Sequence, residues 1–284
     1  MSDARTGAAG RGSSVLQAGA RGLGRWWHVC TRSPRAEATC IGVLSAVAVV
    51  ALWQVASTRW LPSILFPTPL RTLEAWAAMV WEGVLPYHVV VSLVRIAAGF
   101  VVGTLIGVPV GLAMGLFPPV LILLEPYVQF FRFVPPVAWI IPAILWFGIG
   151  ETSKIFLIFY TTVFLVLFNT MVGVSAVARN QIRSAQCFGA SRRQLFLWVS
   201  LPGTLPYVLT GMRLAMGNSF AAVVGAEFIA AQSGLGFLIV DSGTWMATDR
   251  MFAGMLTLGL LGILTDQLFH AASARWASRY LLLP

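Results

Sequence analysis

Charged residues are scarce in this sequence. Asp, Glu, Lys and Arg together make up 10% of the 284 residues, whereas a typical soluble domain has about 25%. Hydrophobic residues make up 58%, and two stretches, residues 96–124 and 155–178, contain no charge at all. Each stretch is long enough to cross a bilayer as a helix. This composition excludes an ordinary water-soluble fold and predicts an all-α membrane protein.

Clustered cysteines and histidines are also absent. The three cysteines form no CxxC pair, and the three histidines are far apart with no HExxH motif, which argues against a zinc site. The only lysine, Lys154, follows Ser153 and precedes Ile155, so the chain cannot supply a Walker-type ATP site. No nucleophile elbow is present either. We therefore expect neither a catalytic residue nor a metal ligand on this chain.

About six hydrophobic segments are predicted to cross the membrane. They are residues 39–56, 89–116, 120–148, 155–178, 205–229 and 251–270. The second contains five glycines spaced every four residues, from Gly99 to Gly115, a period that favours close helix packing in lipid. The third contains Pro135 and Pro136, which remove two backbone donors, so we expect it to be broken rather than one regular helix.

Basic residues outside these spans are unevenly distributed. Six arginines precede residue 38, four lie in residues 179–202 and two follow residue 270, whereas four basic residues lie on the opposite side. The positive-inside rule therefore places both termini in the cytoplasm and explains the net charge of +9 without a nucleic-acid partner. We expect a cytoplasmic tail (1–37), a transmembrane domain (38–274) and a second cytoplasmic tail (275–284). The Trp26-Trp27 pair marks either an interfacial helix or an irregular tail.

Several charges within the predicted spans require an explanation, because a central charge costs about 2.5–3.5 kcal/mol on insertion scales. These charges are Arg95, Glu125, Arg132, Arg213 and Glu227. We expect them to be paired or to face water, and Glu125 and Arg132 are spaced to share a helix face. Structural ion pairing and a role in an anion pathway are both open. We predict that the pathway or its gate also includes Pro135, Pro136 and Trp139.

Residues 179–202 predict two short helices in a cytoplasmic loop. Gly189 suits the left-handed end of the first helix, Ser191 can cap the second, and Pro202 is expected to end it. This loop has basic and apolar faces and suits either docking into a groove of another protein or lying on anionic lipid; the residues are Arg183, Arg192, Arg193, Phe188, Leu195 and Trp198.

This loop resembles the "EAA" coupling loop of ABC-importer permeases, in which Glu-Ala-Ala precedes a glycine and a later Leu-Pro. The matching residues and their neighbours are Arg183, Ser184, Ala185, Gln186, Gly189, Ala190, Ser191, Leu201 and Pro202. Arg183 replaces the glutamate. Further stretches, such as Phe66-Pro67-Thr68-Pro69 and Gly148-Ile149-Gly150-Glu151-Thr152-Ser153-Lys154, resemble the nitrate, sulfonate, taurine and bicarbonate permease branch, the taurine permeases most of all.

The resemblance implies a type I importer permease fold in the bacterial cytoplasmic membrane. It implies a homodimer that binds two cytoplasmic ATPase subunits through the coupling loop, with ATP and Mg²⁺ held by those partners and no cofactor on this chain. It also implies that a small, anionic solute arrives from an extracytoplasmic binding protein. A secondary transporter remains the alternative, although the sequence shows one broken region rather than two inverted halves. A membrane-embedded enzyme is the third possibility.

The segment between the fifth and sixth spans, residues 230–250, is expected to face outward. It contains Gly234, Gly236, Asp241 and Asp249. Exposed acids on a glycine-punctuated loop suit contact with the binding protein, because peripheral charges mainly change association rates. The other interpretation is a re-entrant turn that only caps the helix bundle.

Overall fold

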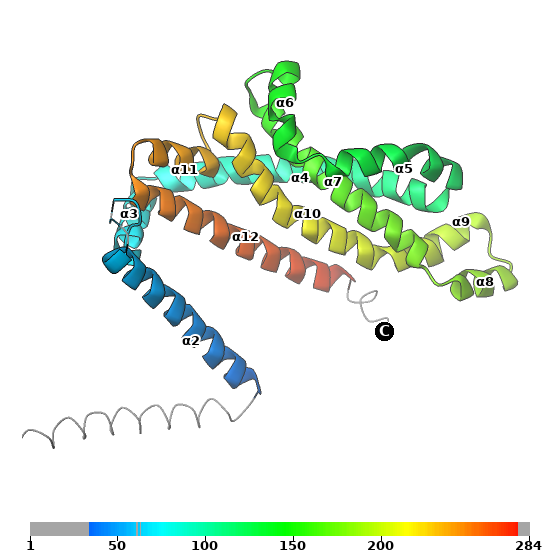
Figure 1. Cartoon of the computed structure of the whole chain (residues 1–284). Coiled ribbons are helices and arrows are strands. Elements are labelled where there is room, and N and C mark those ends of the chain that lie inside the picture. The colour runs from blue at the N-terminus through cyan, green and yellow to red at the C-terminus, as the bar shows by residue number, and fades with distance from the viewer. Residues whose placement is uncertain (1–33, 61, 63, 278–284) are drawn as a thin grey trace, which may run out of the picture. The chain divides into compact units, whose positions relative to one another are not determined.

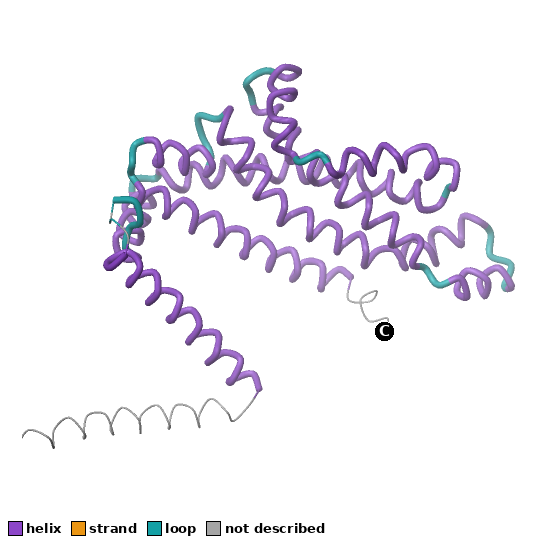
Figure 2. Tube along the Cα trace, in the orientation of Figure 1, coloured by secondary structure: helices purple, strands orange, loops and turns teal. Residues whose placement is uncertain are grey.

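The computed structural model describes residues 34–277 except 61 and 63, and every regular element in that part of the chain is helical (Figure 2). Most of the predicted tail 1–37, with its tryptophan pair, and most of the tail 275–284 lie outside the described residues. Five described helices are long and apolar enough to cross a membrane, or six if one bent pair counts as a single span. The expected all-α membrane fold with about six spans is confirmed.

The chain contacts divide into two units, residues 1–69 and 70–284. In the first unit, helix α2 (Pro34–Val55) covers the first predicted span and continues into η1 (Ala56–Trp60). Its described side chains are largely exposed, as suits a helix surrounded by lipid. Near its end, the Trp53 indole N–H donates to the Pro67 carbonyl at 3.0 Å, and the Trp53 and Phe66 rings lie 6.3 Å apart.

The second unit contains the remaining helices, of which α3 begins at the boundary (Figure 1). In chain order they are α3 (Pro69–Trp81), α4 (Val84–Leu116), α5 (Pro118–Phe133), η2 (Pro136–Trp139), α6 (Ile140–Phe147), α7 (Glu151–Ala176), α8 (Arg179–Cys187), α9 (Arg192–Leu195), η3 (Phe196–Ser200), α10 (Leu201–Ala230), α11 (Leu235–Thr244) and α12 (Thr248–Ala277). Helices α4, α7, α10 and α12 lie side by side, whereas α8 and α9 lie at the opposite end from α11.

The glycine face of α4 packs directly on α7, as its four-residue period predicts. A Cβ atom added at Gly99 would lie 2.6 Å from Ile158, and one added at Gly103 would lie 2.6 Å from Thr162. The same relation continues to Gly115, which faces Val174. In lipid, where no hydrophobic effect drives helices together, such close backbone approach supplies the dispersion contacts that hold them.

This ladder also fixes the direction of the helices. Successive α4 glycines face α7 residues that are displaced by a constant number of positions, so α4 and α7 are parallel. The chain between them must therefore return across the bundle, which α5 and α6 do together. By contrast, α10 is antiparallel to α7, since Gly173 of α7 faces Tyr207 whereas Thr162 pairs with Ser219.

Pro202 does not end a helix, so the prediction that it terminates the second short helix is wrong. Helix continues from Arg192 through η3 into α10, and a 37-residue helical span runs from Arg192 to Phe228. The π-helical turn η3 directly precedes α10, in which Pro202 is the second residue. A π turn changes the i→i−4 hydrogen-bond register, and this change accommodates a residue without an N–H.

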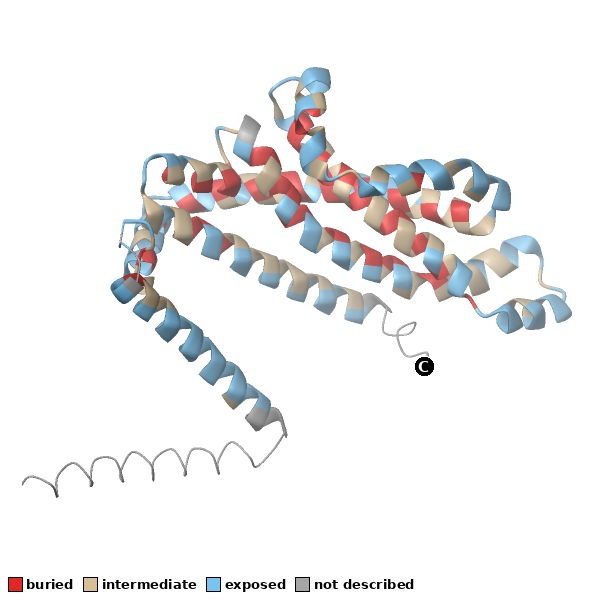
Figure 3. Cartoon of the chain, viewed as in Figure 1, coloured by how far each residue is buried: buried red, intermediate tan, exposed pale blue. Residues whose placement is uncertain are grey.

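Burial follows the helix contacts rather than the polarity of the residues (Figure 3). The buried apolar clusters join α4, α7 and α10, with Ile158, Val166 and Val223 each 0% exposed. Most outward faces remain apolar and exposed, which is the pattern of a helix bundle that lipid or further protein surrounds.

The glycine ladder gives the first prediction. Gly103→Ala places a methyl group against Thr162 in a rigid interface, and we expect it to lower the free energy of unfolding by about 1–3 kcal/mol. Gly259→Ala on α12 is the matched control, because no atom lies within 4 Å of its added Cβ and alanine favours helix. Thermal unfolding midpoints of both purified variants test this. Equal midpoints would show that α4 and α7 are not closely packed.

Candidate functional site

The third hydrophobic segment is broken at Pro135-Pro136, as the sequence predicts. Helix α5 ends at Phe133, and the pair formed by α5 and η2–α6 is bent by 95°. Because Pro135 has no N–H, it cannot donate to the Phe131 carbonyl as a helical residue would. The Val134 N–H donates to that carbonyl at 3.1 Å, and the Tyr160 hydroxyl of α7 donates to it at 2.5 Å. Backbone groups at membrane depth need such partners, so α7 stabilises the break.

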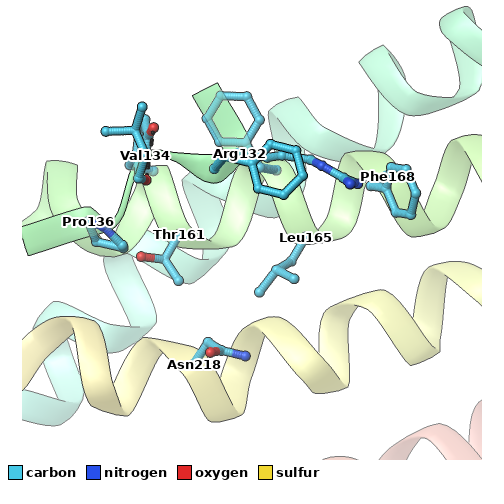
Figure 4. Close-up of a pocket in the computed structure, with 10 residues that line it drawn as sticks. Arg132, Val134, Pro136, Thr161, Leu165, Phe168 and Asn218 are labelled. Atoms are coloured by element: carbon cyan, nitrogen blue, oxygen red, sulfur yellow. Dashed lines mark hydrogen bonds between the residues drawn. The ribbon is translucent and has the colours of Figure 1, made fainter. Parts of the chain in front are cut away.

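A cavity of about 370 Å³ lies beside this break, between α5, α7 and α10 (Figure 4). Its wall includes Pro136 from the break, Thr161 and Phe168 from α7, and Asn218 from α10. The volume lies within the range of about 300–1,000 Å³ that is typical of small-molecule sites. Apolar side chains with a few polar groups line it, a composition that suits a small amphiphilic solute.

Arg132 supplies the charge of this cavity. Its guanidinium carbon lies 4.7 Å from the ring centre of Phe133 and 4.6 Å from that of Phe168, so two aromatic faces hold it by cation–π contacts. It also occupies the last turn of α5, where the helix dipole favours a cation. Within the described part of the chain, no carboxylate forms an ion pair with Arg132.

A second polar cluster, which we call the Arg95 network, lies between α4, α7, α10 and the α10–α11 turn, and all its charged side chains except that of Glu151 are buried. Arg95 is 2% exposed and binds the Glu151 carboxylate through Nε and Nη2, at 2.5 and 2.6 Å. Its Nη1 lies 2.7 Å from both Glu227 Oε1 and the Ser233 carbonyl oxygen. Lys154 adds a fourth charge at 2.9 Å from Glu151, so the two cations and two carboxylates balance.

The same network holds the start of α11. The Ser92 hydroxyl donates to the Glu227 carboxylate at 2.8 Å and accepts the Leu235 N–H at 2.8 Å. The Gly234 N–H donates to His88 Nδ1 at 2.9 Å. The first N–H groups of a helix have no partner within the helix. Side chains of α4 therefore replace water as their acceptors, and α11 is attached to the bundle.

The charges predicted within the spans thus have three different environments. Arg95 and Glu227 pair with each other, and Arg213 pairs with Asp266 at 2.6 Å. Glu125 is exposed on α5, and no ion pair joins it to Arg132 among the described residues. Pairing is confirmed for three of the five predicted charges. A role for any of them in a pathway stays a prediction.

Trp139 belongs to an aromatic cluster beside the break rather than to the cavity wall. Its ring lies 5.4 Å from that of Tyr160, 5.7 Å from Trp146 and 6.0 Å from Phe131. These contacts pack η2 and α6 on α7 and fix the angle at which the broken span continues.

The segment of residues 179–202 has the predicted helix–glycine–helix form, and we refer to it as the α8–α9 segment. Gly189 has φ +79°, and the Ala190 N–H donates to the Ala185 carbonyl, which closes α8. Ser191 then forms a capping box with Gln194: its side chain accepts the Gln194 N–H at 3.3 Å, and the Gln194 amide oxygen accepts the Ser191 N–H at 2.8 Å.

The outward surface of this segment combines charge with exposed aromatic residues. Phe188 is 92% exposed and Trp198 79% exposed. Arg183, Ser184 and Gln186 are exposed as well, whereas Ala185, Ala190, Leu201 and Pro202 are half-buried. A projecting aromatic side chain beside basic residues is typical of a contact surface rather than of a free loop.

The α11 end differs in part from the sequence prediction of a loop. Residues 235–244 are helical, and both Gly234 and Gly236 are buried against Glu227. Gly234 has φ +112° and leaves no space for a Cβ, so its role is close packing. Asp241 is exposed and Asp249 half-buried. Contact between these two acids and a binding protein stays a prediction.

Sequence reasoning missed several partners in these sites. Glu151 and Lys154 lie between two predicted spans, where no buried partner is expected, yet Lys154 is buried. Asp266, Ser92 and Asn218 gave no signal, because each is an ordinary residue until the fold brings another helix to it. The Glu-x-x-Lys spacing at the start of α7 was the available clue, since residues three apart share a helix face.

These features define a polytopic helical membrane protein with one broken span and a projecting helical segment at one end. Residues 103–278 match the family model described as "Binding-protein-dependent transport system inner membrane component". The chain belongs to this family and is a permease component of an ABC importer.

Curated relatives cover most of the chain. The taurine transport system permease protein TauC of Escherichia coli strain K12 is 38% identical over 83% of this chain and 87% of its own length. The putative aliphatic sulfonates transport permease protein SsuC of the same organism is 36% identical over 82% of this chain and 90% of its own length.

Solved structures share the fold. A chain of the MetNI methionine ABC transporter in an inward-facing conformation has a TM-score of 0.55 at 18% identity, covering 66% of this chain and 92% of that chain. An amino acid ABC transporter with histidines gives 0.56 at 15% identity, covering 72% and 98%. At these identities the likeness establishes the fold, and the expected importer permease fold is confirmed.

The Arg95 network gives the second prediction. Arg95→Gln leaves the Glu227 carboxylate buried without its cation, and breaking such a pair costs about 3–5 kcal/mol. We therefore expect a large fall in the thermal unfolding midpoint of the purified protein. The double variant Arg95→Gln, Glu227→Gln removes both charges and is expected to recover much of the loss.

Arg179→Gln is the matched control, because Arg179 is exposed on α8. We expect its unfolding midpoint to stay close to that of the wild type. If Arg95→Gln were as stable as Arg179→Gln, the buried network would not hold the helices together.

Proposed function

We propose that this permease forms, with a second copy of itself, the translocation pathway of an ATP-driven importer for small organic sulfonates. The observation that carries the solute class is the 38% identity, over most of both chains, to a permease named for taurine. A second relative is named for aliphatic sulfonates. Taurine and aliphatic sulfonates share a sulfonate group on a short carbon skeleton, which gives the pathway one common chemistry to accommodate.

In this proposal the α8–α9 segment is cytoplasmic and docks on a partner ATPase, one for each copy of the permease. Its arginines support this orientation by the positive-inside rule. Its exposed Phe188 and Trp198 offer apolar contacts to a groove. The sequence has no Walker-type lysine, so ATP and Mg²⁺ bind to the ATPase and this chain carries no cofactor.

The same orientation places the α11 end outside the cytoplasm, facing an extracytoplasmic binding protein. Movement at one end must then reach the other through α4, α7 and α10, which connect both ends and pack on one another. A secondary transporter would need no ATPase partner. Membership of the binding-protein-dependent family favours the importer.

Gly189→Val tests the proposed coupling. Valine at φ +79° is strained, so the α8–α9 turn must change shape although no neighbouring atom is displaced. We expect the tagged permease to recover about tenfold less ATPase from detergent-solubilised membranes, and to lose ATP-driven taurine uptake in proteoliposomes to the same extent.

Gly83→Val is the matched control for this experiment. Gly83 has φ +75° and no neighbour within 4 Å, but it lies before α4, at the end of the bundle that carries α11. It introduces the same backbone strain away from the proposed ATPase contact and should retain full ATPase recovery. Equal recovery with Gly189→Val and wild type would contradict docking through this turn.

The binding-protein contact gives a further prediction. A peripheral charge changes association rate more than affinity. Asp241→Lys with Asp249→Lys should therefore lower binding-protein-stimulated ATP hydrolysis about threefold to tenfold at low salt, with a smaller defect at high salt. Asn at both positions should give an intermediate defect, and basal hydrolysis should not change. Stimulation that is the same in all variants at every salt concentration would exclude this surface.

A further inference from the structure

The cavity at the broken span contains a cation without an acidic partner, although membrane-spanning segments normally pair their charges. Three other basic side chains of the described bundle have carboxylate partners: Arg95 and Lys154 bind glutamates, and Arg213 binds Asp266. Arg132 instead has two aromatic rings beside its guanidinium. These rings fix its position but leave its charge and its N–H donors available, since cation–π contact uses the face of the guanidinium.

The shape of the site places this charge beside a space that a solute can fill. Arg132 reaches from the end of α5 over α7, while Thr161 and Leu165 extend from α7 toward α10, where Asn218 lies (Figure 4). The Asn218 amide uses one N–H on the Leu214 carbonyl at 3.0 Å, so its second N–H remains a donor. The Thr161 hydroxyl donates to the Leu157 carbonyl at 3.0 Å and therefore contributes a polar surface but no free proton.

We propose that Arg132 binds the sulfonate group of the solute in transit, in the cavity of about 370 Å³ between α5, α7 and α10. This inference rests on the proposed function for the solute class, and it adds the residue that recognises the solute. The guanidinium offers several donors in a fixed fork that matches an oxyanion. The aromatic and aliphatic wall contacts the short carbon skeleton, and the Asn218 amide offers a second donor from α10.

The position of the site fits a transient contact. The cavity borders the break at Pro135-Pro136, where the two parts of the span meet at a bend of 95°. Side chains at such a bend move relative to α7 and α10 when either part rotates. An anion held by Arg132 on α5 and contacted by Asn218 on α10 would therefore lose one contact when the helices separate, which allows release.

The first test measures the sign of the electric potential in the cavity and needs no transport. Thr161→Cys is introduced into permease whose three native cysteines are replaced by serine, assembled with its ATPase in phosphatidylcholine nanodiscs. We compare how fast this cysteine reacts with two thiol reagents of opposite charge, an anionic sulfonatoethyl thiosulfonate and a cationic trimethylammonioethyl thiosulfonate. We expect the anionic reagent to react faster. Arg132→Gln should lower the ratio of the anionic to the cationic rate about tenfold.

Two controls separate a local effect from a general one. Arg275→Gln removes one exposed positive charge from α12 and should leave the ratio unchanged. Thr244→Cys, exposed on α11, should give a ratio that does not depend on Arg132. An unchanged ratio in Arg132→Gln, or no labelling of Thr161→Cys in any nucleotide state, would overturn the proposal. The first result would mean that another group, such as a lipid phosphate or a carboxylate of the second copy, neutralises Arg132.

Lipid phosphate shares the oxyanion chemistry of a sulfonate, so a second arm distinguishes them. Labelling of Thr161→Cys is repeated with 10 mM taurine or ethanesulfonate in discs that contain phosphatidylglycerol. Protection by the free sulfonates supports the solute site. A loss of anion preference on adding phosphatidylglycerol, with no protection by either sulfonate, assigns Arg132 to lipid and overturns the proposal.

Transport kinetics complete the test. In proteoliposomes with saturating binding protein, Arg132→Gln should lower the maximal rate of taurine uptake about tenfold while ATPase recovery stays normal, and Arg132→Lys should restore part of the rate. If wild-type protein transported no sulfonate, the proposed solute class would fail, whereas the labelling ratio would still report whether Arg132 controls anions in the cavity. If Arg132→Gln took up taurine at the wild-type rate, the proposed sulfonate site at Arg132 would be overturned, whereas the proposed function would stand.

Discussion

The absence of water inside the bilayer is the constraint on which this structure depends. A polar group that loses its hydrogen-bond partner there cannot turn to solvent, so another part of the protein must replace the partner. Tyr160 adds a donor to the Phe131 carbonyl, to which Pro135 cannot donate, and His88 and Ser92 accept the first N–H groups of α11. In each case the substitute comes from a different helix. Irregular backbone is therefore found where two helices already lie against each other.

Close packing between α4 and α7 makes these substitutions possible. The five glycines of α4 bring the two backbones together, and the parallel arrangement places the start of α7 beside the turn of α4 that contains Ser92 and Arg95. Arg95, on the turn before Gly99, is then placed within reach of Glu151 at the start of α7. A bulkier face on α4 would separate the helices and take the Glu151 carboxylate away from the buried Arg95 guanidinium. The packing face and the buried network thus depend on each other.

The sequence predicts those features that rest on periodicity and on local backbone chemistry. The apolar runs identified the spans, the spacing of glycines identified the packing face, and Gly189 with Ser191 identified the form of the α8–α9 segment. Each of these signals lies within a short stretch of chain.

The error at Pro202 has a physical reason, because a π-helical turn accommodates a residue that normally ends a helix. The network around Arg95 joins residues that are more than 50 positions apart, and no local pattern specifies such a pairing. The burial of Gly234 and Gly236 was missed for the same reason.

Two arginines in the spans illustrate how the same residue type serves different ends in one membrane protein. Arg95 is enclosed, forms ion pairs with two carboxylates and binds no further ligand. Its charge therefore serves to hold four segments together. Arg132 is held by aromatic rings, which stabilise a cation without neutralising it. Replacing the rings with a carboxylate would hold the side chain more tightly but would cancel the field in the adjacent cavity. In the proposed anion pathway the charge must be positioned yet remain uncompensated, and cation–π contact would meet both requirements at the bend of the broken span.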